Sequence, residues 1–351
     1  MDDRQALMAA VLAEPDEDTP RLALADWLQE HGDDHDRARA DHIRLQIEAS
    51  KLPDNSPERV KLEQQFVVVQ KAHGEAWLGP LAKYAKPDLS RNDVFLGGIL
   101  WWWYTPTKSF LLKPHQMAVC EWFPRVGVYL LVLNDKATRE PEVATSPALA
   151  WVSQFQWSHS KLDDSGLAAL AKSSHVGRLT SFALQQCKVT DAGLKAFAET
   201  TAMPNLRHFG LSSTLRLAKY TSAGVLAVLN SSRFPKLCDL ELESEQTTTL
   251  DYKGLFANPG VKKLIRLRLG WKSEPGCAFR CPHLTNLRRM SVNSGVVTDA
   301  DVDALLANPA LAGLKDLWMY GMNGGKPHLS AATEKRLRER FGEHVIRYSA
   351  A

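Results

Sequence analysis

The chain has 351 residues, 44% of them apolar, and 43 Lys and Arg against 40 Asp and Glu leave a net charge of +3. That composition supports a folded core, and the near balance of charge argues against a dedicated nucleic-acid or membrane-surface binder. Five cysteines at irregular spacing fit reduced thiols. There is no secretory leader pattern and no apolar run long enough for a bilayer, so we expect a cytoplasmic protein without membrane attachment.

The first residues predict a small helical domain, residues 1–55. Thr19 is suited to cap a helix that has Pro20 at its first position, and Gly32 is suited to end that helix. The next stretch, "HGDDHDRARADH" (residues 31–42), is rich in His and Asp but matches no recognised metal-ligand pattern. It favours a solvated charged loop leading into a helix, with a metal site as the alternative.

A further helix is expected to begin at Ser56-Pro57 and to run to about His73, followed by a capping region that completes residues 56–125. Within that region "VFLGGILWWWY" (residues 94–104) predicts a strand with aromatic side chains on both faces. The three consecutive tryptophans, residues 101–103, either cap the end of the structure that follows or form a ligand patch.

From residue 126 the chain repeats a pattern of three apolar positions, L-x-x-L-x-L, at intervals of about 27 residues. Each triplet predicts a strand. The triplets are Val126/Tyr129/Leu131, Val152/Phe155/Trp157, Leu179/Phe182/Leu184, Leu206/Phe209/Leu211, Leu237/Leu240/Leu242, Leu264/Leu267/Leu269, Leu287/Met290/Val292 and Leu314/Leu317/Met319.

About ten residues after a triplet comes a side chain suited to cap a helix, so each unit predicts a strand, a turn and a capped helix. In "KVTDAGLKAFAE" (residues 188–199) we expect Thr190 to begin the helix, Val189 and Leu194 to point inward, and Gly193 to permit close packing of helix on strand. Cys187 occupies a small polar position of the unit and is expected to be structural. The predicted caps are Asp163, Thr190, Thr221, Asp251, Thr298 and Ser330.

These motifs resemble two known families. Residues 126–351 look like a leucine-rich repeat array of the ribonuclease-inhibitor-like kind, and "PDEDTPRLALADWLQEHGD" (15–33) with "RADHIRLQ" (39–46) is similar to the repeat-companion domain that precedes such repeats in many planctomycete proteins. That family usually has an aromatic residue where this chain has His42. The resemblance implies an α/β fold: a solenoid with parallel strands on the concave side and helices outside, preceded by a small all-α domain. It implies architecture rather than an activity.

The sequence contains no recognised catalytic or nucleotide-binding motif, so we expect no enzymatic activity and no cofactor. The nearest approach to a metal site is Cys277-x-x-x-Cys281-x-His283, which lacks a fourth ligand at a matching position. A compact loop with buried thiols is the competing interpretation.

The outward positions of the later strands carry the candidate binding site. Their carboxylates and guanidiniums either pair across adjacent strands or bind a partner, and Arg, Trp and Tyr are enriched at protein-interface hot spots. The candidate residues are Asp239, Glu241, Glu243, Arg266, Arg268, Trp271, Arg289, Asp316, Trp318 and Tyr320.

The hypothesis is therefore a monomeric, non-catalytic scaffold that binds a protein or peptide on the concave strand face. One alternative is nucleic-acid binding through Arg266, Arg268 and Arg289, with Trp271 as a stacking platform. The other is a metal-dependent enzyme that uses the Cys277/Cys281/His283 loop or residues 31–42.

Overall fold

The computed structural model places the chain in two compact units, residues 1–130 with 151–154, and residues 131–150 with 155–351. The residues that the structure describes are 3–13, 17–52, 56–79, 82, 89–91, 94–96, 99–100, 102–106, 127–131, 140–158, 162–200, 203–213, 219–244, 250–270, 273–293, 297–320 and 329–347.

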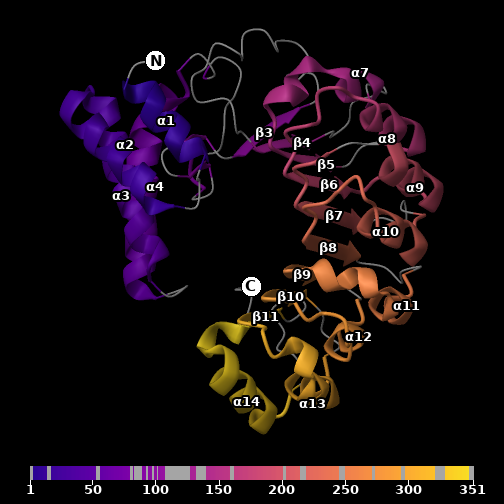
Figure 1. The fold of residues 1–351 in the computed structure, drawn as a ribbon. Helices are drawn as coiled ribbons and strands as arrows, with labels where there is room; N and C mark the ends of the chain where they lie inside the picture. The colour runs from indigo at the N-terminus through magenta and orange to yellow at the C-terminus, as the bar shows by residue number, and fades with distance from the viewer. Residues whose placement is uncertain are drawn as a thin grey trace. The chain divides into compact units, whose positions relative to one another are not determined.

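The described residues of the first unit form four α-helices, and the first three share an apolar core. The core is formed where the apolar stripes of α2 and α3 meet those of α1, and removing these side chains from water stabilises the packing. The helices are α1 (Asp3–Ala13), α2 (Asp18–His31), α3 (Asp34–Ser50) and α4 (Pro57–Leu78) (Figure 1). The core side chains are Met8, Val11, Leu24, Ala25, Leu28, Ala40, Ile43 and Ile47.

The start of α2 differs from the prediction. The helix begins at Asp18 with Glu17 in the N-cap position, so Thr19 lies inside the first turn and the predicted Thr19 cap is wrong. The predicted end is confirmed, because the backbone N–H of Gly32 donates to the carbonyl of Leu28 at 3.0 Å.

Most of residues 31–42 are helical, which corrects the predicted loop. The Asp33 carboxylate accepts from the backbone N–H of Asp36 at 2.9 Å and caps α3. Asp34 and Asp36 then lie in the first turn, where the positive end of the helix dipole favours carboxylates. The next helix, α4, is capped by Ser56 as predicted, but it continues past His73 to Leu78.

His42 is fully buried between α3 and α4 among aromatic rings. Its ring lies 5.4 Å from that of Phe66 and 5.1 Å from that of Trp77, and the Phe95 ring is 6.3 Å away. Desolvation disfavours the charged imidazolium and lowers the pKa of His42 to about 4. A neutral imidazole therefore fills the position that the resemblance assigns to an aromatic residue.

The stretch predicted as one strand over residues 94–104 contains separate strands. β1 (Phe95–Leu96) pairs antiparallel with β2 (Ile99–Leu100), and β3 (Trp102–Pro106) follows. The side chains of the three tryptophans at 101–103 lie outside the described residues, so the choice between cap and ligand patch stays a prediction. The same holds for the first apolar triplet, whose side chains on and before β4 (Gly127–Leu131) are not described.

The second unit alternates strands with helices. From β6 to β12 each strand pairs in parallel with the next strand of the chain, and the helices lie together on one side of this sheet (Figure 1). The strands are β5 (Gln154–Ser158), β6 (Ser181–Gln185), β7 (His208–Ser213), β8 (Asp239–Ser244), β9 (Arg266–Leu269), β10 (Arg289–Asn293), β11 (Asp316–Tyr320) and β12 (Ile346–Arg347). The helices are α7 (Glu140–Thr145), α8 (Asp164–Ala171), α9 (Asp191–Thr200), α10 (Ser222–Leu229), α11 (Tyr252–Ala257), α12 (Pro275–Phe279), α13 (Asp299–Ala307) and α14 (Ala331–Phe341), with 3-10 turns at Pro147–Trp151, Pro259–Lys263, Pro309–Leu311 and Glu343–Val345.

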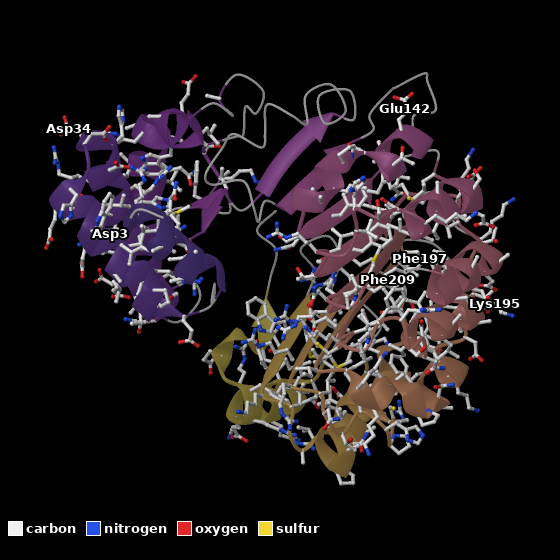
Figure 2. The ribbon with its side chains drawn as sticks, turned by 45° about the horizontal axis from the view of Figure 1, so that its top comes forward. Asp3, Asp34, Glu142, Lys195, Phe197 and Phe209 are labelled. Carbon is white, nitrogen blue, oxygen red and sulfur yellow. The ribbon has the colours of Figure 1, made fainter. Side chains whose placement is uncertain are left out.

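The apolar triplets build the core between sheet and helices. All residues of the seven triplets from Val152 to Met319 are buried, which confirms those predictions. Strand pairing sets Phe182 opposite Phe209, so equivalent side chains of successive units stack on one another. Figure 2 shows Phe197 of α9 and Phe209 of β7 on the inner side of that helix, with ring centroids 6.2 Å apart, whereas Lys195 points away.

Helix capping occurs where the sequence predicts it. Five of the predicted caps, Asp163, Thr221, Asp251, Thr298 and Ser330, accept a hydrogen bond from a backbone N–H in the first turn of their helix. The sixth, Thr190, accepts from the backbone N–H of Ala192 at 3.2 Å. Cys187 is buried and its thiol donates to the carbonyl of Gln185 at 3.3 Å, in agreement with a structural role.

A carboxylate on each of two helices, α8 and α9, also forms hydrogen bonds to the next strand–helix repeat. Asp164 at the start of α8 accepts from the backbone N–H and the hydroxyl of Thr190 at 2.8 and 2.6 Å, and Asp191 does the same for Thr221 at 2.6 and 2.6 Å. A Cβ on Gly193 would lie 2.1 Å from Oδ1 of Asp164. This glycine therefore permits close approach of two helices, rather than of helix and strand as predicted.

The last described elements are the charged helix α14 and the short closing strand β12. Leu337 and Phe341 of α14 are buried, as are Val345 and Ile346 behind them. In β12, Ile346 pairs with Met319 of β11. These residues cover the apolar end of the sheet.

Candidate functional site

The sheet residues that alternate with the buried triplets form a polar surface, which we call the polar strand face. On β6 the burial alternates between half-buried and buried, and on β9 between exposed and buried. Strand geometry explains this, because successive side chains point to opposite sides of a sheet. The described residues of the polar strand face are Ser181, Ala183, Gln185, His208, Gly210, Ser212, Asp239, Glu241, Glu243, Arg266, Arg268, Arg289, Ser291, Asp316 and Trp318.

Strand register arranges these residues in rows across the sheet. One row runs Ser181, His208, Asp239, Arg266, Arg289 and Asp316, each paired with the next. The neighbouring row runs Ala183, Gly210, Glu241, Arg268, Ser291 and Trp318. The structure thus brings the predicted residues of four strands, β8 to β11, onto one surface.

The carboxylates of β8 pair with the guanidiniums of β9. Arg268 donates to Glu241 Oε2 at 3.0 Å, and an Arg266 nitrogen lies 3.6 Å from Asp239 Oδ2. The Arg266 and Arg268 side chains remain 49% and 51% exposed. Exposed pairs of this kind contribute about 0–1 kcal/mol each to stability, so their main effect is to hold the guanidiniums in place.

A hydrogen-bonded series extends from Glu241 to β6, and sequence reasoning missed it. Ser181 Oγ lies 2.8 Å from His208 Nδ1, and His208 Nε2 lies 3.3 Å from Glu241 Oε2. Burial alone would raise the pKa of Glu241, but the hydrogen bond from His208 and the charge of Arg268 outweigh it and lower the pKa. The sequence signal was available in principle: all three residues occupy outward positions in consecutive units.

Arg289 differs from the other two arginines. It is exposed, and no ion pair joins it to another residue in the part of the chain that the structure describes. Its directly opposed neighbours are Arg266 of β9, a like charge that is unfavourable, and Asp316 of β11, an opposite charge.

Trp318 lies half-buried at the end of the second row. Its indole N–H donates to Asp316 Oδ1 on the same strand. Ser291 separates it from Arg268, so a small side chain stands between an aromatic and a cationic one. Trp271 and the side chain of Tyr320 lie outside the described residues, and their predicted roles stay predictions.

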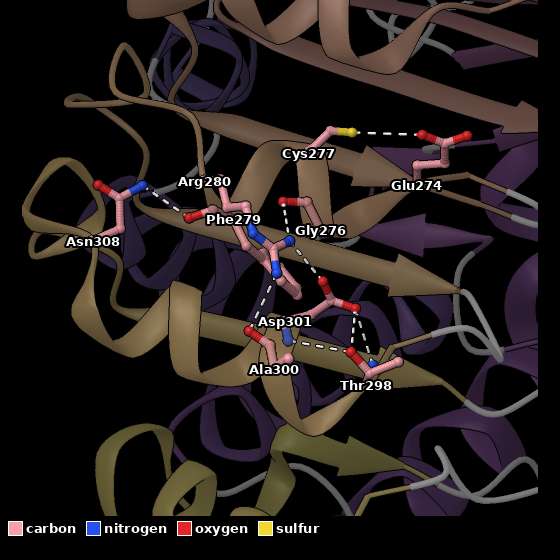
Figure 3. Close-up of polar contacts among 9 residues, drawn as sticks. All are labelled: Glu274, Gly276, Cys277, Phe279, Arg280, Thr298, Ala300, Asp301 and Asn308. Atoms are coloured by element: carbon pink, nitrogen blue, oxygen red, sulfur yellow. Dashed lines mark hydrogen bonds and ion pairs between the residues drawn. The ribbon is translucent and has the colours of Figure 1, made fainter.

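The segment proposed as a metal site is not the compact loop with buried thiols that was the competing interpretation, because Cys277 lies half-buried in α12 and only Cys281 is buried. The Cys277 thiol donates to Glu274 Oε2 at 3.5 Å (Figure 3), while the buried Cys281 thiol donates to the carbonyl of Phe256 at 3.0 Å. Burial raises the pKa of both thiols. Within the described residues no group of three or more His, Cys, Asp or Glu side chains is arranged to hold a metal ion, the Cys277/Cys281/His283 set and residues 31–42 included.

The contacts around that loop join α12 to α13 instead. Arg280 donates to Asp301 Oδ1 at 2.7 Å and to the carbonyl of Gly276 at 3.0 Å, and Asp301 also accepts from the Thr298 hydroxyl at 2.8 Å (Figure 3). Asn308 donates to the carbonyl of Phe279 at 2.8 Å. These contacts therefore hold neighbouring strand–helix repeats together.

Among the described helices, none has the length and apolar character that crossing a bilayer requires. Compared with known proteins, the chain matches no family model and no curated sequence.

Proposed function

We propose that this chain is a non-catalytic scaffold that binds a protein or peptide on its polar strand face. In this proposal the second unit is a leucine-rich repeat solenoid of the ribonuclease-inhibitor-like kind, and the first unit is its repeat-companion domain. The recurrence of apolar triplet, strand and capped helix, in a sheet whose strands follow chain order, supports the solenoid.

One observation carries the binding proposal. Arg266 and Arg268 are held by carboxylates of the neighbouring strand and yet stay about half exposed, beside the exposed Arg289 and the half-buried Trp318. Side chains that are already fixed lose less conformational entropy on association. Arginine and tryptophan are also the residue types that most often dominate binding energy at protein interfaces.

The charge distribution favours a protein partner over a nucleic acid. A phosphate backbone attracts continuous positive charge, whereas here Asp239 and Glu241 of β8 lie directly opposite the guanidiniums of β9. A protein surface can present both signs in matching positions, which makes a mixed face selective.

The test compares single substitutions in the full chain. Partners are captured from the source cells with the wild-type chain, and the affinity of each purified partner is then measured for Arg268→Ala and Trp318→Ala. We expect each substitution to weaken binding about tenfold or more, as is usual for hot-spot residues. Lys195→Ala is the matched control, because this exposed side chain points away from the sheet on α9 (Figure 2), and it should bind as wild type does.

Two results would overturn the proposal. Unchanged affinity of both variants for every captured partner would remove the polar strand face as the binding site. Capture that disappears after nuclease treatment and falls steeply with salt would instead support nucleic-acid binding through Arg266, Arg268 and Arg289.

A further inference from the structure

Two histidines that are far apart in the sequence meet on the surface of the first unit. His35 lies in the first turn of α3 and His73 lies near the end of α4, and their Nδ1 atoms are 3.1 Å apart. The two rings are inclined at 71°, with centroids 5.2 Å apart. His35 belongs to the His- and Asp-rich stretch 31–42, but its partner comes from outside that stretch.

The spacing of the two nitrogens suits a shared metal ion. Imidazole nitrogens bind zinc at about 2.0–2.1 Å. An ion about 2.05 Å from two nitrogens that are 3.1 Å apart makes an N–metal–N angle of about 98°. This angle lies between the right angle of square-planar or octahedral coordination and the wider tetrahedral angle, so neither nitrogen has to move far.

One buried residue contacts both histidines, at the backbone of His35 and at the ring of His73. The indole N–H of Trp77 donates to the backbone carbonyl of His35 at 2.8 Å, and the Trp77 ring stacks on His73 with planes inclined at 17°. Trp77 is 3% exposed, so the surrounding core fixes its position. These contacts fix the backbone at His35 and the ring of His73, so ordering the pair around a metal costs less conformational freedom.

Solvent reaches the pair, since His35 is exposed and His73 is half-buried. No third His, Cys, Asp or Glu joins them in a ligand group within the described residues, so water would complete the coordination. Without a metal, the same geometry is a hydrogen bond between two imidazoles, and an ion would take the place of the shared proton.

We propose that His35 and His73 form a two-histidine site for a late first-row transition metal ion, Cu²⁺, Ni²⁺ or Zn²⁺, that links α3 to α4. The bound ion ties two helices of the first unit together and stabilises that unit. The proposed role of the ion is structural, and no reaction is proposed at this site. Copper should bind most tightly, following the general order of affinity of these ions for nitrogen ligands. The site is independent of partner binding on the polar strand face.

The experiment uses the untagged full chain, titrated with CuCl2, NiCl2 and ZnCl2 at neutral pH by calorimetry. We expect one ion per chain at this site, an electron paramagnetic resonance spectrum of the Cu²⁺ form with two imidazole nitrogens, and a higher temperature of unfolding with metal. His73→Ala and His73→Gln should weaken binding about tenfold or more, reduce the spectrum to one imidazole, and abolish the thermal shift. Two substitutions are used so that a folding defect in one of them, detected by circular dichroism, does not decide the result.

His31→Ala is the matched control. His31 is another exposed histidine of the same unit, and its ring nitrogen contacts the carbonyl of Trp27 at 3.2 Å, so its loss should change neither stoichiometry nor spectrum. Equal metal uptake by wild type and both folded His73 variants would overturn the proposal and assign the metal to other histidines. Absence of saturable binding by the wild-type chain would overturn it as well.

Discussion

At the scale of single residues, burial decides what the ionisable groups can do. His42 is a polar residue that follows Asp41 in a charged stretch of the sequence. In the structure its side chain is nevertheless 0% exposed and lies among the rings of Phe66 and Trp77. In the unfolded chain the imidazole is solvated and titrates near 6.5, whereas in the folded chain its pKa is about 4. Between pH 4 and 6.5, unfolding is therefore linked to proton uptake by this one residue.

This linkage gives a prediction for stability against pH. The folded pKa of His42 lies below the unfolded value, so its contribution is fully present above pH 6.5 and is lost as the pH falls toward 4. The loss is about 3 kcal/mol over that window, from about 1.4 kcal/mol per pH unit. Urea unfolding at pH 7, 5.5 and 4.5 measures it, with His42→Phe as the comparison because phenylalanine does not titrate. If the free energy of unfolding of the wild-type and His42→Phe chains fell equally with pH, the lowered pKa of His42 would not be the cause.

At the scale of secondary-structure elements, α9 and α10 are each positioned by the preceding helix as well as by their own capping residue. Asp164 and Asp191 stand at the first positions of α8 and α9, where carboxylates favour the helix dipole. Each of them also accepts hydrogen bonds from the backbone N–H and the hydroxyl of the threonine that caps the next helix. The spacing between helices is therefore set by short hydrogen bonds and by glycines that leave room for them.

Gly193→Ala tests this arrangement. Alanine normally stabilises a helix interior by up to about 1 kcal/mol over glycine. Here its Cβ would lie 2.1 Å from Asp164 Oδ1, so the carboxylate must leave Thr190, and we expect a net loss of about 1–3 kcal/mol in the free energy of unfolding. Gly177→Ala is the control, since nothing lies within 4 Å of its added Cβ, and it should be near neutral. Urea unfolding of both variants shows whether Gly193→Ala raises or lowers the free energy of unfolding.

At the scale of the whole molecule, a row of parallel strands has open ends that must be covered. The described C-terminal elements, α14 and β12, do this at one end. They bury Leu337, Phe341, Val345 and Ile346, and β12 supplies hydrogen-bonding partners to β11. An uncovered strand would expose both apolar side chains and unpaired backbone groups, which promotes association between molecules.

Removal of residues 329–351 should therefore be far more damaging than removal of residues 348–351. The longer deletion removes four buried apolar side chains, each worth about 1.5–3 kcal/mol, and uncovers Met319. We expect a lower temperature of unfolding and concentration-dependent light scattering for that chain alone. Unfolding at the wild-type temperature after the longer deletion would show that α14 and β12 are not needed as a cover.

The sequence by itself determined the elements of the second unit. Apolar triplets, capping residues and their interval depend on neighbours within a few positions, so the strands near Phe182 or Leu267 and the cap at Thr298 can be derived from local pattern. Local pattern misled at Thr19, which was expected to cap a helix starting at Pro20, whereas the helix starts at Asp18 with Glu17 at the N-cap position.

Only the tertiary structure decided which side chains meet. His208 reaches Glu241 through strand register, and His35 reaches His73 through the packing of two helices. Each contact joins residues about thirty or more positions apart, and its distance depends on the packing of every element between them. The elements are local consequences of the sequence, whereas the sites belong to the assembled fold.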